Sequence, residues 1–539
     1  MINKSNFSIF FLIVSTLIAT GCSESLLINE DKVFRYNEHS NISSLDPIYS
    51  STLRNIWPVN QIFNGLVQLN DSLKIKPDIA KSWTISKNGL EYKFLIKDQI
   101  FYHKSKIFGK DSTRTVNAKD FEYSFNRLKD PYLGSPGSWA IKNVNSFKAE
   151  NDSLFVIKLK APFSAFLGLL SMKYFSVVPH EVVDYYGNKF GKNPIGTGPF
   201  KFKRWEENIK LVLRKNNLYF EKDINGTNLP YLEAISITFL PDKKSEFMEF
   251  AQNKIDFINS IDSSFKDQLI STDGNLKKEH SKTIKLISGP YLNTEYIGFY
   301  LGDKKSQIQS KKLRLAINYA IDRKKMMKYL RNNIGYAANN GFVPLGLNSK
   351  NIVDGFKYDL VKAKKLIKEY KTENKKEKIE LKLTSDANYL DIVEFIQREL
   401  QKIDIDLSIN IVPASTLRQG KSNGKFEMFR ASWIADYPDS ENYLSLFYSK
   451  NLAPNGPNYT HFQNNEYDKL FESTYNEQNS TKRKKIYQIL DSLVLKNSPI
   501  IPLYYDKVMR FSQMNIEGLT TNPVNQLNLK RVYKKYITF

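Results

Sequence analysis

A strand–helix–strand unit at residues 378–413 constrains the fold of this chain more than any other feature of its sequence. Two runs of alternating apolar residues, KIELKLTS (378–385) and DLSINIVP (406–413), flank the amphipathic run LDIVEFIQRELQKI (390–403). Alternation is typical of half-buried strands, whereas apolar residues spaced three and four apart are typical of a helix. Because such a unit places its two strands parallel in one sheet, we predict an α/β protein.

The rest of the chain extends this pattern. With 539 residues the chain exceeds what one core usually covers, and 41% of it is hydrophobic, so two or three well-packed domains are expected. Strands are predicted at 90–103, 153–160, 209–215 and 429–436, and helices within 117–131, at 310–333 with Ser310 as its N-cap, and at 358–370.

The first 22 residues, MINKSNFSIFFLIVSTLIATGC, predict export and lipid attachment. A lysine precedes an apolar stretch at 7–19 that is short for a membrane span. The small residues before Cys22 resemble the bacterial lipoprotein box, although Ala19 stands where leucine is usual. We expect a signal peptide at 1–22, lipidation of Cys22, a tether at 23–31 and a periplasmic or extracytoplasmic location. An ordinary cleaved signal is the alternative.

The charge and the reactive residues exclude several function classes. The formal charge of +23 is spread along the chain, and no fold signature for nucleic acid accompanies it, so nucleic-acid binding is not expected. The five histidines do not fall at metal-ligand spacing, and Cys22 is the single cysteine. No catalytic motif was found, so we expect neither an enzyme nor a metal or other cofactor.

Eight segments in order resemble the large solute-binding proteins of ABC importers that take up dipeptides and oligopeptides. They are SLDP, IFNGLVQLN, IKPDIAKSWTISKNGLEYKFLIKDQIFYH, VNAKDFEYSFNRLKDP, NPIGTGPFKF, LRLAINYAIDRKKM, YDLVKAKKLIKEY and ADYPDSENYLSLF. In the third of these, the resemblance implies a proline-led helix before the tryptophan and a strand that ends before a histidine.

The resemblance also implies the architecture and the partners. It implies a two-lobed periplasmic-binding-protein fold (type II-like) of three domains with a hinge. Domain I would comprise 32–58, 194–288 and 505–539, domain II 59–193, and domain III 289–504. The implied partners are a short peptide, the permease subunits of an ABC importer, and the membrane through the lipid anchor, with the protein itself a monomer.

The candidate binding residues lie mainly in FRASWIADYPD (429–439). If 429–436 is extended, Arg430 and Asp436 face one side, roughly 20 Å apart or less at about 3.3 Å per residue. Two such charges on a strand are usually salt-bridge partners. Within the resemblance, however, Asp436 is expected to bind the α-ammonium of a peptide and Arg430 its carboxylate.

Neighbouring residues complete the expected site. Trp433 would line a side-chain pocket, with core filling as the alternative. The backbones of Ser432 and Ile434 would pair with the peptide main chain, and Asn41, Ile42 and Ser43 would supply a second edge. Three alternatives stay open: another cargo in the same fold (a metal chelate, an oligosaccharide or a cell-wall peptide), a secreted hydrolase, and a structural surface lipoprotein.

Overall fold

The computed structural model describes residues 32–347 and 354–535, and its largest element is an eleven-stranded mixed sheet. The predicted signal peptide, Cys22 and the tether lie outside the described residues. From one edge to the other, the hydrogen-bonded order is β15 (Ile405–Ile411), β14 (Ile379–Ser385), β16 (Met428–Ile434), β12 (Ile284–Phe299), β17 (Ile500–Gln513), β11 (Phe257–Asn259), β1 (Val33–Asn37), β10 (Ala234–Thr238), β9 (Lys210–Lys215) and β8 (Phe200–Glu206), with β13 (Tyr336–Ala337) paired to β17 off this path.

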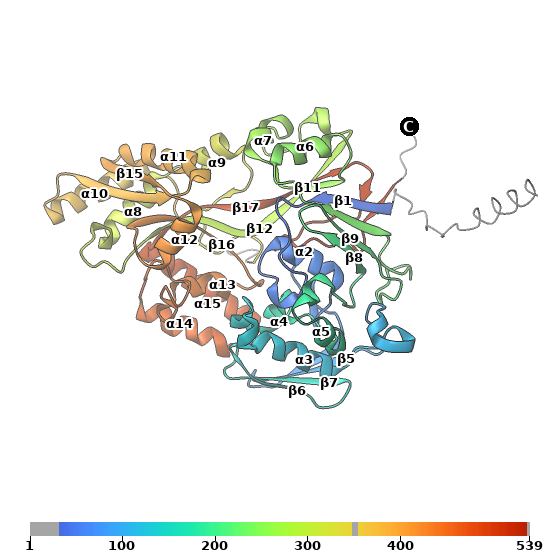
Figure 1. The fold of residues 1–539 in the computed structure, drawn as a ribbon. Coiled ribbons are helices and arrows are strands. Elements are labelled where there is room, and N and C mark those ends of the chain that lie inside the picture. Colours follow the sequence, from blue (N-terminus) through green and yellow to red (C-terminus); the bar gives the residue numbers. More distant parts are fainter. Residues whose placement is uncertain (1–31, 348–353, 536–539) are drawn as a thin grey trace, which may run out of the picture.

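The two longest strands, β12 and β17, cross the middle of the molecule (Figure 1). They pair antiparallel from Ile284↔Gln513 to Gly298↔Ile500, and the register shifts between Pro290 and Thr294. We call residues 32–288 and 505–535 the first lobe and residues 289–504 the second lobe. The chain therefore passes from lobe to lobe twice, once in each of two adjacent strands.

The strand–helix–strand prediction in the second lobe is confirmed. β14 and β15 are parallel neighbours, in register from Ile379↔Ile405 to Ser385↔Ile411, and α11 connects them. The expected helix at 310–333 is two helices, because Asp322 caps the second by accepting a hydrogen bond from the Lys325 N–H at 3.0 Å. The helices of this lobe are α8 (Lys311–Ala320), α9 (Arg323–Arg331), α10 (Leu360–Asn374), α11 (Leu390–Gln401), α12 (Ala414–Ser422), α13 (Glu441–Leu444), α14 (Asn465–Asn476) and α15 (Ser480–Asn497).

The first lobe contains a separate four-stranded antiparallel sheet, ordered β4 (Ala80–Ile85), β5 (Glu91–Ile96), β7 (Leu154–Leu159) and β6 (Val144–Ala149). The proline-led helix expected before Trp83 is therefore wrong: this segment is β4, and the register pairs Trp83 with Phe94 of β5. The remaining elements of this lobe are α2 (Leu53–Ile62), α3 (Ala118–Lys129), α4 (Phe166–Leu169), α5 (His180–Tyr186), α6 (Lys243–Ala251), α7 (Ser263–Leu269) and the short pairs β2 (Val67–Leu69) with β3 (Ile75–Pro77) and β18 (Ile516–Glu517) with β19 (Tyr533–Lys534).

Three large apolar clusters form the cores. One lies wholly within the second lobe, between Leu292 and Tyr504. The other two lie in the first lobe, one over the four-stranded sheet and one over β1, β9 and β10. Of the second lobe, Tyr437 alone belongs to the cluster over the four-stranded sheet. Within residues 32–347 and 354–535, none of the helices has the length and apolar character that crossing a membrane requires.

Candidate functional site

A cavity of about 300 Å³ lies between the lobes at the end of β16. The second lobe contributes Tyr291 and the stretch from Ile434 to Asp436, and the first lobe encloses the rest. The first-lobe residues are Ser50, Ser51, Thr52, Leu53, Ile56, Leu69, Ser171, Met172, Lys173, Tyr174, Val524 and Gln526. A larger cavity of about 880 Å³ shares Leu53 and Tyr291 with it, so the two form adjoining parts of one interlobe cleft.

Asp436 is the acid of the smaller cavity. Its backbone N–H donates to the Asn442 Oδ1 at 3.3 Å, and this oxygen also accepts from the Trp433 Nε1 at 2.8 Å. Surrounding protein atoms raise the pKa of Asp436, and the Asn442 side chain partly offsets that shift. Among the described residues, no lysine, arginine or histidine nitrogen lies within 4.0 Å of its carboxylate. The carboxylate of Asp436 therefore has no counter-charge among the described residues.

Arg430 is engaged within the protein. Its Nη2 lies 2.5 Å from the Glu295 Oε2, its Nη1 lies 3.7 Å from an Asp386 oxygen, and its guanidinium stacks 3.3 Å from the centre of the Tyr389 ring. Two acids thus face one arginine, and Arg430 is not among the residues that line the cavity at Asp436. The structure does not bring the two predicted charges together around one cavity.

β16 offers an open edge beside Asp436. The Ala435 N–H donates to the Leu292 carbonyl at 2.9 Å, so odd-numbered residues of this stretch bond to β12. The N–H and C=O groups of Ser432 and Ile434 therefore point the other way. On that side β14 pairs with β16 only at Met428 and Phe429, and no other described strand does. An extended peptide can add to this edge.

The other predicted residues divide between the cleft and the cores. The Ile434 side chain lines the cavity, whereas Trp433 packs against the second-lobe core with its indole N–H on Asn442. Asn41, Ile42 and Ser43 do not line it. Ile42 is buried in the core, and the Ser43 hydroxyl accepts from the Asn55 side chain at 2.6 Å.

The first-lobe wall that the sequence interpretation assigned to 41–43 is supplied instead by 50–53, which follow the SLDP segment. The signal for it was present: a polar Ser-Ser-Thr run directly before α2, between two apolar segments. The interpretation also missed Tyr291 in β12 and the 171–174 segment, because only the folded chain brings them to Asp436.

Tyr437 joins the two lobes next to the cavity. Its ring is buried in the first-lobe cluster and lies edge-on to Phe163, with ring centres 6.0 Å apart. Pro438 also lies beside Gly168, where an added Cβ would make an ordinary van der Waals contact with its ring at 3.5 Å. These contacts fix the segment that carries Asp436 against the first lobe.

The described residues contain no group of three or more histidine, cysteine, aspartate or glutamate side chains arranged to hold a metal ion. What the smaller cavity presents is the Asp436 carboxylate without a cationic partner among the described residues, beside an open strand edge. Such a combination can hold a molecule that has a cationic end and an extended, hydrogen-bonding backbone.

Comparison with known proteins gives consistent matches over nearly the whole chain. Residues 74–455 match the model for bacterial extracellular solute-binding proteins, family 5 (middle region). The dipeptide-binding protein DppE of Bacillus subtilis is 24% identical, with 95% of this chain and 93% of that protein covered. The glutathione-binding protein GsiB of Escherichia coli K12 is also 24% identical, with 94% and 96% covered.

Solved structures show the same fold. HbpA2 from Haemophilus parasuis superposes with a TM-score of 0.81 at 22% identity, covering 94% of this chain and 100% of that one. Helicobacter pylori DppA in complex with the peptide STSA superposes with a TM-score of 0.74 at 24% identity, covering 94% and 98%.

Proposed function

The chain belongs to the bacterial extracellular solute-binding proteins of family 5, and from this premise we propose that it captures short peptides between its lobes. The family comprises binding components of transporters that act outside the cytoplasm, not enzymes. The peptide is then delivered to the permease of an ABC importer. Binding to both lobes at once stabilises the closed arrangement over the open one, which is how capture is signalled to the permease.

The observation that carries this proposal is the Asp436 carboxylate, which faces the interlobe cavity without a cationic partner. A peptide α-ammonium there completes a charge-assisted hydrogen bond. The adjacent open edge at Ser432 and Ile434 then pairs with the peptide backbone. Main-chain pairing supplies affinity without reading side chains, and the cavity's water accommodates side chains of different size.

The orientation of the peptide follows from these two features. Its amino terminus lies at Asp436, and its chain runs along β16 toward the larger cavity. The resemblance in sequence assigns Arg430 to the peptide carboxylate. Because Glu295 and Asp386 already balance its charge, we propose instead that Arg430 stabilises β16. In the larger cavity Arg331 pairs with Asp506 at 3.1 Å and Lys266 donates to the Leu330 carbonyl at 3.2 Å, so Lys507 is the cation assigned to the carboxylate end.

Calorimetry with matched tripeptides tests the proposal. Ala-Ala-Ala should bind, and its N-acetylated form should bind at least about 30-fold more weakly, since a buried charge pair contributes about 2–5 kcal/mol. Native mass spectrometry of the protein as purified should also reveal retained peptides. Equal affinity for the free and acetylated peptides, or no peptide binding at all, would contradict the proposal.

Three further parts of the proposal concern the whole protein. Cys22 carries the lipid anchor, the protein acts as a monomer, and the domains are 32–58 with 194–288 and 505–539, 59–193, and 289–504. Metabolic labelling with a radioactive fatty acid tests the anchor, because a Cys22→Ser variant should lose the label.

A further inference from the structure

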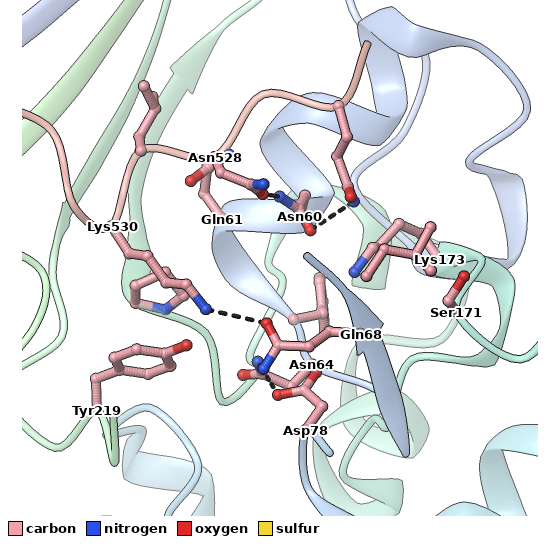
Figure 2. Close-up of a pocket in the computed structure, with 15 residues that line it drawn as sticks. Asn60, Gln61, Asn64, Gln68, Asp78, Ser171, Lys173, Tyr219, Asn528 and Lys530 are labelled. Carbon is pink, nitrogen blue, oxygen red and sulfur yellow. Dashed lines mark hydrogen bonds between the residues drawn. The ribbon is translucent and has the colours of Figure 1, made fainter. Parts of the chain in front are cut away.

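Lys173 is a buried lysine whose ammonium has no partner. It begins the short 3-10 helix η6 (Lys173–Phe175), and only 9% of its surface is exposed. No hydrogen bond is made by its Nζ, and no acid of the described chain lies within 4.0 Å of it. Figure 2 shows the side chain pointing into a small polar cavity of about 30 Å³, and the same residue lines the cavity at Asp436.

Two acids that line or adjoin the small cavity, Asp78 and Glu221, make their hydrogen bonds and ion pairs with other groups. Asp78 accepts from the Asn64 side chain at 2.9 Å and from the Gly65 N–H at 3.0 Å. Glu221 pairs with the Lys530 ammonium at 2.8 Å. Burial lowers the pKa of Lys173 to about 8, although Asp78 acts in the opposite direction. Binding an anion therefore stabilises this buried ammonium more than it would stabilise a solvated lysine.

The cavity has room for that anion. Its volume of about 300 Å³ corresponds to roughly ten water molecules at about 30 Å³ each. Asp436 of the second lobe and Lys173 of the first both line it. The lining also includes apolar side chains, among them Met172, Tyr174 and Val524. The lining therefore suits a residue with an ammonium at one end, a short apolar stem and an acid at the other.

We propose that Lys173 binds the side-chain carboxylate of an acidic residue at the amino terminus of the peptide, which makes this chain selective for peptides that begin with glutamate or aspartate. The inference rests on the proposed function and adds a specificity to it. The ligand's first residue would bridge the lobes electrostatically, with its ammonium on Asp436 and its carboxylate on Lys173.

Calorimetry with Glu-Ala-Ala and Gln-Ala-Ala tests the inference, because these peptides differ only in the charge of the first side chain. We expect the wild-type protein to bind Glu-Ala-Ala about tenfold more tightly or better, as befits a charge-assisted hydrogen bond. In Lys173→Met the two affinities should come within about twofold of each other, while binding of Gln-Ala-Ala is retained.

Lys97→Met is the matched control. It removes one lysine from the same lobe, but Lys97 lines neither cavity, so the preference for Glu-Ala-Ala should persist. Equal wild-type affinities for the two peptides would overturn the inference while leaving the proposed function intact, whereas absence of binding of either peptide would overturn both. If the folded Lys173→Met variant still preferred Glu-Ala-Ala, the preference would arise from the net positive charge of the protein, and the inference would be overturned.

Discussion

Arg430 of β16 and Glu295 of β12 form a buried ion pair, with 2.5 Å between Nη2 and Oε2. Glu295 lies opposite Ser432 in the ladder, so the arginine reaches diagonally across two residues to meet it. The pair therefore ties together the two strands that carry the open edge and the first interlobe crossing.

Removing Arg430 should destabilise the protein strongly. Arg430→Met leaves Glu295 buried without its cation, and we expect a loss of about 3–5 kcal/mol in the free energy of unfolding. The double variant Arg430→Met/Glu295→Gln should recover part of that loss. Urea denaturation of both variants measures the effect. If Arg430→Met abolished peptide binding at unchanged stability, the assignment of Arg430 to the ligand carboxylate would be restored.

Asp436→Asn should weaken peptide binding without unfolding the protein. The variant keeps the shape of the side chain but leaves the peptide ammonium without a counter-charge, at a cost of about 2–5 kcal/mol in binding free energy. Calorimetry with Ala-Ala-Ala measures this loss. Asp404→Asn is the control, because Asp404 lies in the same lobe, has an exposed side chain and lines neither cavity. Similar losses in both variants would show that Asp436 has no special role.

Peptide affinity should fall on the acid side at a higher pH than an ordinary aspartate would cause. Burial raises the pKa of Asp436, and only the ionised carboxylate pairs with an ammonium. Affinity is thus present above this raised pKa and lost as the pH falls through it. A calorimetric series from pH 4 to pH 8 should show this decline in the wild type and a flatter profile in Asp436→Asn. Parallel profiles would exclude Asp436 as the titrating group.

Tyr437→Ala should favour an open arrangement of the lobes. The substitution removes a ring that the second lobe buries in the first-lobe cluster, beside Phe163. We expect a larger radius of gyration by small-angle X-ray scattering in the peptide-free protein, and weaker peptide binding. Tyr132→Ala, which alters a fully exposed tyrosine, should change neither. An unchanged radius would show that this contact does not restrain the lobes.

Stability should decrease between about pH 4 and pH 7, partly because of Asp491. This residue of α15 is buried and accepts from the Phe342 N–H at 2.8 Å, and burial raises its pKa to about 7. Its folded-state pKa exceeds the unfolded value, so its contribution is present at low pH and is lost as the pH rises through 7. The contribution is on the order of a few kcal/mol. Asp491→Asn should flatten the pH profile of the urea midpoint, and an unchanged profile would contradict this.

The sequence predicted the elements with strong periodicity. The unit at 378–413 forms as expected because its alternating and amphipathic runs agree with burial on a sheet and on one helix face. The segment around Trp83 became a strand instead of a helix, because it pairs with β5 on the four-stranded sheet. The predicted helix at 310–333 is interrupted because Asp322 caps α9, and the apolar pattern continues across that cap without showing it.

The site was predictable only in part, because charge balance depends on residues far apart in sequence. The role of Asp436 was implied by the resemblance, and the shared face of Ser432 and Ile434 follows from the local strand pattern. Glu295 and Asp386, which engage Arg430, lie 135 and 44 residues away from it, and strand spacing gives no information about them. For the same reason no pattern in the sequence indicated that Lys173 would line the cavity.

The threading of β1 has a consequence for biogenesis. β1 pairs with β10 and β11, β11 pairs with β17, and the Trp57 indole donates to the Asn525 carbonyl at 2.9 Å. The N-terminal strand thus cannot complete its sheet until the ribosome has synthesised almost the entire polypeptide. Contacts between residues so far apart in sequence form slowly, so we expect the first lobe to complete its fold late.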